Sequence, residues 1–178
     1  MKRYIALLRG VNVGGKNKVS MAVLKSAFEG KFLDVSTYIN SGNVIFSCDD
    51  SDMMTLQQSC RKIIKDSFHL DIAVAVITSD ELSDALVQAP AWWDADSGAK
   101  HNTIFVISPA TAESVIETIG ETKPEYEKIA YHGQVIFWSA PLETFSRTRL
   151  TKLVSGTAYD KITIRNANTT KKLLQLVK

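Results

Sequence analysis

Cysteine and histidine are scarce in this sequence, whose 178 residues include two cysteines, Cys48 and Cys60, and three histidines. Two cysteines cannot form a disulfide framework, and their spacing is not that of zinc ligands. The histidines lie far apart, and none has a carboxylate at ligand spacing. We therefore predict a reduced, cytoplasmic protein with no metal site and no cofactor.

Long hydrophobic runs are also missing. The apolar segment Tyr4–Leu8 is too short for the core of a signal peptide, and no other segment approaches the length of a membrane span. With 45% hydrophobic and 22% charged residues, the composition is typical of a globular protein with one ordinary domain or two small ones. We expect no association with a membrane.

No catalytic signature is evident. Ser41 lacks the G-x-S-x-G context and the neighbouring histidine that a serine nucleophile needs. No other acid, base and nucleophile are placed together in the sequence. Whether the protein is an enzyme therefore stays open.

Charge, in contrast, is strongly segregated along the chain. Residues 1–47 carry a net charge of +5, residues 48–140 a net charge of −9, and residues 141–178 a net charge of +6. Such asymmetry creates local electrostatic fields that the total charge of +2 does not reveal. Two interpretations are open: the basic ends pair with the acidic middle, or they converge on a shared anion-binding face.

The patterns of apolar residues predict two series of elements in the same order. In the first, a strand at residues 3–9 precedes a helix that begins after Ser20 and stops at Gly30. The runs DVSTYIN and GNVIFS then form a hairpin around Asn40-Ser41-Gly42-Asn43. A second helix to Phe68 and the strand IAVAVIT complete the order βαββαβ, the split βαβ or ferredoxin-like motif.

The same order recurs after a short helix to about Gln88. Its expected elements are a strand in NTIFVIS, a helix at 110–119, a hairpin at His132-Gly133, a helix within 142–155, and a strand at 161–165.

The sequence thus predicts an α+β fold of two ferredoxin-like halves. They comprise residues 1–88 and 101–178, with a connecting loop at 89–100. A terminal helix from about Asn168 to Leu176 ends the second half.

The loop after the first strand is rich in glycine and lysine. Residues 10–17, GVNVGGKN, match the phosphate-binding pattern G-x-x-x-x-G-K-[ST] except at the last position, which lacks the hydroxyl that ligates magnesium. Lys16 does not begin a helix, and the hairpin that follows is not part of a P-loop topology. These features disfavour a nucleoside triphosphatase.

Two interpretations of this loop remain. Backbone amides in a glycine-rich loop can form an anion-binding concavity, to which Arg9, Lys16 and Lys18 add charge. Alternatively, the loop is only a connection, with glycines at positive φ and solvated lysines. Long loops of this kind are often functional.

Near the C-terminus, Arg165 and Asn166 lie between a strand and a helix capped by Asn168 or Thr169. A basic group beside a helix N-terminus favours an anion. The lysines that follow in this helix fit its solvated face instead.

Three motifs, YIALLRGVNVGGKNKVSM, TYINSGNVIFS and TIRNANT, resemble those of the bacterial family labelled domain of unknown function 1697, over essentially the whole chain. The resemblance implies two ferredoxin-like α/β-plait halves and no established reaction. The family usually has tryptophan where this chain has Ala167. The family's recurrent residues correspond to Arg9, Gly10, Asn12, Gly14, Gly15, Asn40, Ser41, Gly42, Asn43, Arg165, Asn166 and Asn168.

Our leading hypothesis is that the protein binds a phosphate-bearing ligand, a nucleotide or a nucleic acid, where the glycine-rich loop meets the C-terminal basic residues. The alternatives are an enzyme acting on a small phosphorylated or amide substrate, and a partner-binding module. The oligomeric state stays open. The candidate ligand-binding residues are Arg9, Gly10, Asn12, Gly14, Gly15, Lys16, Lys18, Asn40, Ser41, Asn43, Arg165, Asn166 and Asn168.

Overall fold

The structure, a computed structural model, describes residues 1–49, 52–154 and 156–178. It divides into two compact units. The first unit comprises Met1–Leu82 and Leu173–Lys178, and the second unit comprises Ser83–Lys172.

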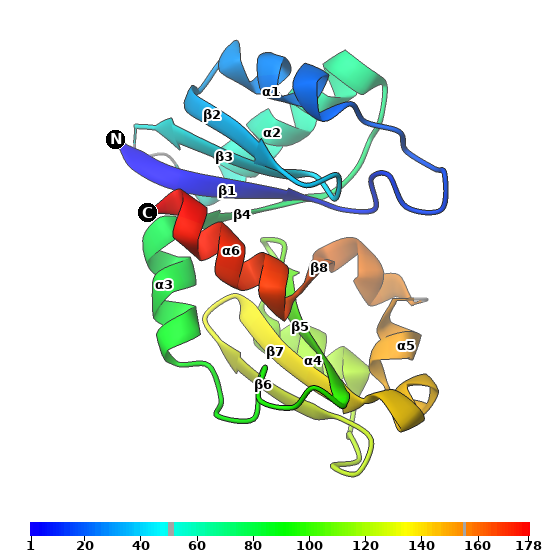
Figure 1. Ribbon diagram of the computed structural model, residues 1–178. Coiled ribbons are helices and arrows are strands. Elements are labelled where there is room, and N and C mark those ends of the chain that lie inside the picture. Colours follow the sequence, from blue (N-terminus) through cyan, green and yellow to red (C-terminus); the bar gives the residue numbers. More distant parts are fainter. Residues whose placement is uncertain (50–51, 155) are drawn as a thin grey trace. The chain divides into compact units, whose positions relative to one another are not determined.

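The first unit contains a four-stranded antiparallel sheet in the order β2-β3-β1-β4. Two helices, α1 and α2, lie on one face of this sheet (Figure 1). The elements are β1 (Lys2–Leu8), α1 (Met21–Glu29), β2 (Leu33–Tyr38), β3 (Asn43–Cys48), α2 (Met53–Phe68), β4 (Val74–Thr78) and the start of α3 (Ser79–Val87).

Aromatic side chains form the centre of the core under these helices. Phe46 of β3 contacts Tyr4, Phe28 and Phe32, with a ring-centroid distance of 4.2 Å to Phe32. Burying each such side chain stabilises the fold by about 1.5–3 kcal/mol. As predicted, α1 begins after Ser20, whose hydroxyl accepts a hydrogen bond from Val23 N, and ends at Gly30.

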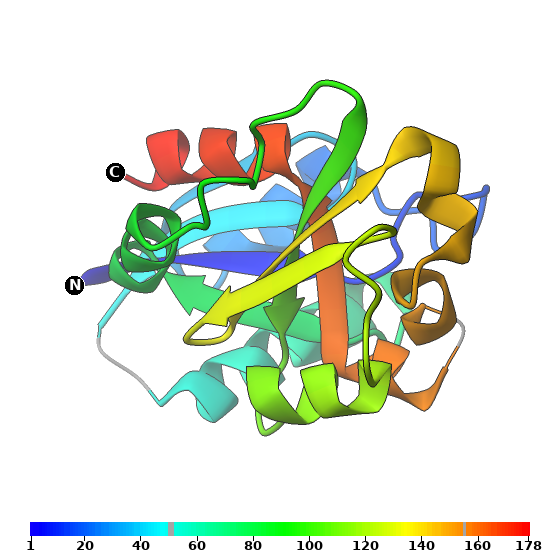
Figure 2. The ribbon, with the colours of Figure 1, turned by 90° about the horizontal axis from the view of Figure 1, so that it is seen from below.

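The second unit repeats the strand order, as β6-β7-β5-β8, with every neighbouring pair antiparallel. Helix α4 covers one face of this sheet (Figure 2). The elements are the rest of α3, β5 (Ala99–Val106), α4 (Ala112–Ile119), β6 (Lys128–His132), β7 (Val135–Pro141), the 3-10 helix η1 (Leu142–Arg147), α5 (Leu150–Leu153), the 3-10 helix η2 (Thr157–Lys161), β8 (Ile162–Asn166) and the start of α6 (Ala167–Val177), whose last residues belong to the first unit.

The predicted α+β fold with two βαββαβ halves and a terminal helix is therefore confirmed, but three boundaries differ. Strand β5 begins at Ala99, within the predicted loop, because it pairs with β7 as far as Ala99↔Pro141. The helix predicted within 142–155 is instead η1 and the four-residue α5.

The third difference concerns the terminal helix, which begins at Ala167. The cap is Asn166, whose Oδ1 accepts a hydrogen bond from Thr169 N at 2.8 Å, and not Asn168 or Thr169 as the sequence suggested. An asparagine side chain caps a helix by satisfying an amide of its first turn.

Candidate functional site

The glycine-rich segment after β1 folds as a small hairpin, which we call the basic hairpin and define as residues 9–18. It extends beyond the end of the sheet in its unit (Figure 1). Val13 and Lys16 form a β-bridge, and Lys16 N donates to Val13 O at 3.0 Å. Gly14 and Gly15, at the tip, have φ of 57° and 76°. Two consecutive positive φ values are the requirement of a type I′ turn, which explains the glycine pair.

Asparagine side chains hold the base of the basic hairpin. Asn12 Nδ2 donates to Val19 O and to Asn40 O, while its Oδ1 accepts from Val19 N. Asn17 Nδ2 donates to Gly10 O at 3.0 Å. Asn12 and Asn17 themselves adopt positive φ, of 55° and 47°. Both asparagines therefore shape the loop, and of the two only Asn12 is among the ligand-binding candidates predicted from the sequence.

The charged side chains of the basic hairpin differ in exposure. Lys16 and Lys18 are exposed, and the ammonium group of neither side chain has an ion-pair or hydrogen-bond partner in the part of the chain that the structure describes. Arg9 is half-buried. Val13 at the tip is also exposed, whereas Val11 and Val19 are buried in the core and fix both ends. The basic hairpin therefore presents two lysines on a braced support.

The turn between β2 and β3 lies against the base of the basic hairpin. Asn43 is fully buried, and its Nδ2 donates to Tyr38 O and to Ser41 Oγ. Gly42 has φ of 74°, and a Cβ there would lie 2.6 Å from Val11. The left-handed residues of this turn are Ile39 and Gly42. The predicted turn is present, and its polar residues position the hairpin.

The remaining predicted residues, Arg165, Asn166 and Asn168, belong to the second unit. Arg165 is buried, and its Nη1 donates to Thr163 Oγ1 at 2.9 Å and to Ile164 O at 2.8 Å. Burial lowers the pKa of Arg165 to about 10. Asn166 caps α6, and Asn168 is exposed in its first turn. The convergence of these residues with the basic hairpin stays a prediction.

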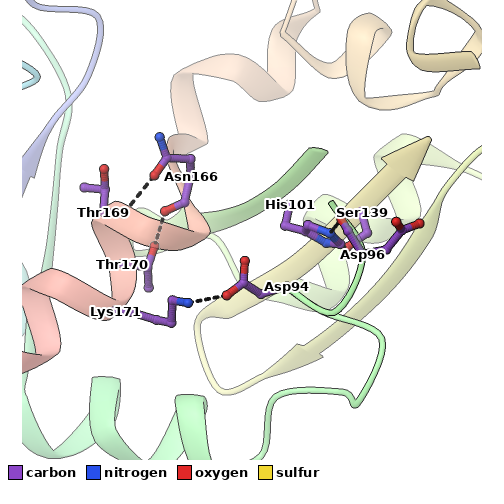
Figure 3. A network of polar contacts seen from close by, with 8 residues as sticks. All are labelled: Asp94, Asp96, His101, Ser139, Asn166, Thr169, Thr170 and Lys171. Atoms are coloured by element: carbon purple, nitrogen blue, oxygen red, sulfur yellow. Dashed lines mark hydrogen bonds and ion pairs between the residues drawn. The ribbon is translucent and has the colours of Figure 1, made fainter. Parts of the chain in front are cut away.

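The structure also brings together polar residues that the sequence did not single out as a site (Figure 3). His101 Nδ1 lies 2.5 Å from Ser139 Oγ, and His101 Nε2 lies 2.7 Å from Asp96 O. Because the carbonyl can only accept, His101 Nε2 donates to Asp96 O, and Nδ1 shares the second hydrogen bond with the Ser139 hydroxyl. The two residues face each other across β5 and β7.

This pairing resembles that of a serine and its base, but Ser139 is only 6% exposed. The pair therefore has the character of a cross-strand hydrogen bond. Asp94 forms an ion pair with Lys171 of α6 in the same unit (Figure 3). No local pattern identifies this pair, because its residues are 77 positions apart.

The described residues offer neither a metal cluster nor a membrane-spanning helix. Within the described ranges, no group of three or more His, Cys, Asp and Glu side chains could hold a metal ion. No helix among those residues is long and apolar enough to cross a membrane. Cys48 and Cys60 do not form a disulfide.

Fold and sites together define a protein of two α+β units, each with the strand order of the split βαβ motif. The chain belongs to the family described as protein of unknown function (DUF1697), whose model matches residues 1–137. It is also similar to a conserved bacterial protein from Streptococcus pneumoniae, with 32% identity and a TM-score of 0.86 over 99% of both chains. No curated protein matches the chain. The family resemblance inferred from the motifs is therefore confirmed.

Proposed function

We propose that this protein binds the phosphate groups of a nucleic acid through the basic hairpin. Cysteines that form no disulfide favour a cytoplasmic location, which is part of the same proposal. Lys16 and Lys18 are the contacts to phosphate, and Arg9 contributes positive charge at the base.

The observation that carries this proposal is a difference in length between two equivalent connections. The first strand and first helix of the first unit are joined by residues 9–20, whereas residues 107–111 make the same connection in the second unit. Five residues are thus sufficient for this step of the fold. The additional residues of the first unit form the basic hairpin, so topology alone does not require them.

The shape of the basic hairpin favours a polynucleotide over a free nucleotide. A mononucleotide is usually enclosed in a concave pocket, and a P-loop surrounds phosphate with unpaired amides. Here the amides of Asn12 and Lys16 bond within the hairpin, to Asn17 O and Val13 O. A projecting two-stranded ribbon with exposed lysines suits a groove or a strand of nucleic acid instead.

The experiment is a binding titration of fluorescent single-stranded and duplex oligonucleotides and of a labelled mononucleotide. Each titration would be run at several salt concentrations on the wild type and on Lys16→Gln/Lys18→Gln. A matched control, Lys123→Gln/Lys128→Gln, removes the same charge from two exposed lysines of the second unit. For duplex DNA, we expect the hairpin variant to lose about 1.8 from the slope of log K against log salt, about 0.9 per phosphate contact.

Equal binding by the wild type and the hairpin variant would contradict the proposal. A loss of binding in both double variants would indicate an effect of net charge, which also contradicts a specific role of the basic hairpin. Preference for the mononucleotide would favour the alternative of a nucleotide-binding site.

A further inference from the structure

The second unit contains an open cavity of about 860 Å³. It lies beside the first residues of β5, where the sheet has one strand fewer. Strand β8 pairs with β5 only as far as Asn102↔Asn166, whereas β7 pairs with β5 as far as Ala99. The start of β5, the loop before it, η1 and the first turn of α6 supply the lining of the cavity. Its volume is within the range of small-molecule sites, roughly 300–1,000 Å³.

Four charged residues lie in or beside this cavity. Asp94, in the lining, is neutralised by its ion pair with Lys171 (Figure 3). The other two, Asp96 and Lys100, carry opposite charges and also line it. Neither has an ion-pair partner among residues 1–49, 52–154 and 156–178, and they do not pair with each other. The cavity thus contains one uncompensated carboxylate and one uncompensated ammonium group.

Both charges are held in place by neighbouring groups. Asp96 Oδ1 accepts a hydrogen bond from Gly98 N at 2.8 Å, and His101 Nε2 fixes the backbone carbonyl of Asp96 at 2.7 Å. Lys100 Nζ lies 4.0 Å from the ring centroid of Phe145, which also lines the cavity. A cation over an aromatic face is attracted by the ring quadrupole. The two charges are therefore positioned although both side chains are exposed.

Carboxamides complete the polar lining. The side chains of Asn102 and Asn168 line the cavity and form no hydrogen bond in the described part of the chain. Each carboxamide offers donors and an acceptor, so it can recognise an amide or a hydroxyl group of a ligand.

We propose that this cavity binds a small zwitterion, an amino acid derivative of about dipeptide size. Its ammonium group contacts Asp96, its carboxylate contacts Lys100, and its amide bonds to Asn102 and Asn168. A ligand with both charges compensates both groups, whereas a simple anion or cation leaves one of them uncompensated. This site is independent of the basic hairpin.

The test uses three probes on the 178-residue chain, followed by amide NMR at constant ionic strength. Glycylglycine has both charges, N-acetylglycine lacks the ammonium group, and glycinamide lacks the carboxylate together with its methylene group. We expect saturable shifts of the Asp96, Lys100 and Asn168 amides with glycylglycine, and affinities lower by about tenfold or more for the other two probes.

Two variants remove one charge each and keep the local contacts. Lys100→Met retains an unbranched stem over Phe145 and should reduce the affinity for glycylglycine to that for glycinamide. Asp96→Asn retains the oxygen that accepts from Gly98 N. This variant should reduce the affinity for glycylglycine to that of the wild type for N-acetylglycine. The control is Lys123→Met, since Lys123 also lies over an aromatic ring, that of Tyr126; it should bind like the wild type.

Three results would overturn the inference. The first is an absence of saturable shifts with glycylglycine in the folded wild type. The second is equal affinity for glycylglycine and for either singly charged probe, which would define a simple anion or cation site. The third is unchanged affinity in Lys100→Met and Asp96→Asn.

Discussion

The first unit joins its first strand to its first helix with residues 9–20, whereas the second unit makes the same step with residues 107–111. The crossover from the third to the fourth strand of each unit differs in its helical structure. In the first unit it is one continuous helix, the 16-residue α2, and in the second unit it is divided into η1, α5 and η2. Because the strand order is the same, neither difference is required by the sheet.

The divided crossover of the second unit depends on one buried carboxylate. Glu127 is 2% exposed, and its oxygens accept from Trp138 Nε1 at 2.8 Å, Arg149 N at 2.6 Å and Leu150 N at 3.3 Å. It thereby satisfies amides at the start of α5, a helix too short to be stable alone. The first unit has an aromatic cluster and a long helix instead. The second unit thus has a buried polar contact where the first unit has a long helix, and the first unit has a longer connection after its first strand than the second unit needs for the same step.

The largest expected effect follows from removing this carboxylate. Glu127→Ala should lower the free energy of unfolding of the second unit by about 2–4 kcal/mol, because three donors lose their acceptor and two of these hydrogen bonds are buried. Chemical denaturation followed by tryptophan fluorescence would measure it. The control Glu125→Ala, at an exposed position, should change stability by less than about 0.5 kcal/mol. Equal stabilities of the two variants would show that α5 does not depend on Glu127.

A second prediction compares two glycines of the first unit. Gly42→Ala should destabilise by about 2–3 kcal/mol, since the new Cβ would lie 2.6 Å from Val11 and 2.8 Å from Leu8 at positive φ. Gly14→Ala should cost about 1 kcal/mol, because its φ is also positive but no atom lies within 4 Å of the new Cβ. Thermal unfolding of both variants measures the difference. A larger effect at Gly14 would mean that the basic hairpin, and not the β2–β3 turn, limits the stability of this region.

The third prediction concerns the bracing of the basic hairpin. Asn12→Gly retains the freedom to adopt positive φ and removes three hydrogen bonds, so it should cost about 1 kcal/mol. Faster hydrogen exchange at Lys16 and Val19 should accompany this loss, while β1 amides remain protected. Unchanged exchange at both amides would contradict the role of Asn12 as a brace.

The smallest expected effect is that of one lysine on binding. Lys16→Gln should lower the salt slope for duplex DNA by about 0.9 and leave stability unchanged. The measurement is the oligonucleotide binding titration at several salt concentrations that also tests the proposed function. A variant with an unchanged slope would remove Lys16 from the set of phosphate contacts.

Local patterns in the sequence predicted much of this structure. The order of strands and helices, the cap at Ser20 and the turns at 40–43 and 132–133 all depend on neighbouring residues, and all are confirmed. The pair Gly14-Gly15 is also typical of a two-residue β-hairpin turn. The hairpin was not predicted, because the same glycines also match the phosphate-binding pattern. Glu127 and the Asp94–Lys171 ion pair depend on contacts between distant residues, which no local period encodes.

The most direct test of the central claim shortens the basic hairpin. A variant in which Gly-Gly replaces residues 12–17 retains the buried Val11 and Val19 and brings the connection close to the length used in the second unit. We predict that it folds with a melting temperature within about 8 °C of the wild type, corresponding to about 2 kcal/mol, and that its oligonucleotide affinity falls by about tenfold or more. Undiminished binding by the folded variant, or failure of the variant to fold, would contradict the claim that the basic hairpin serves binding and not the fold.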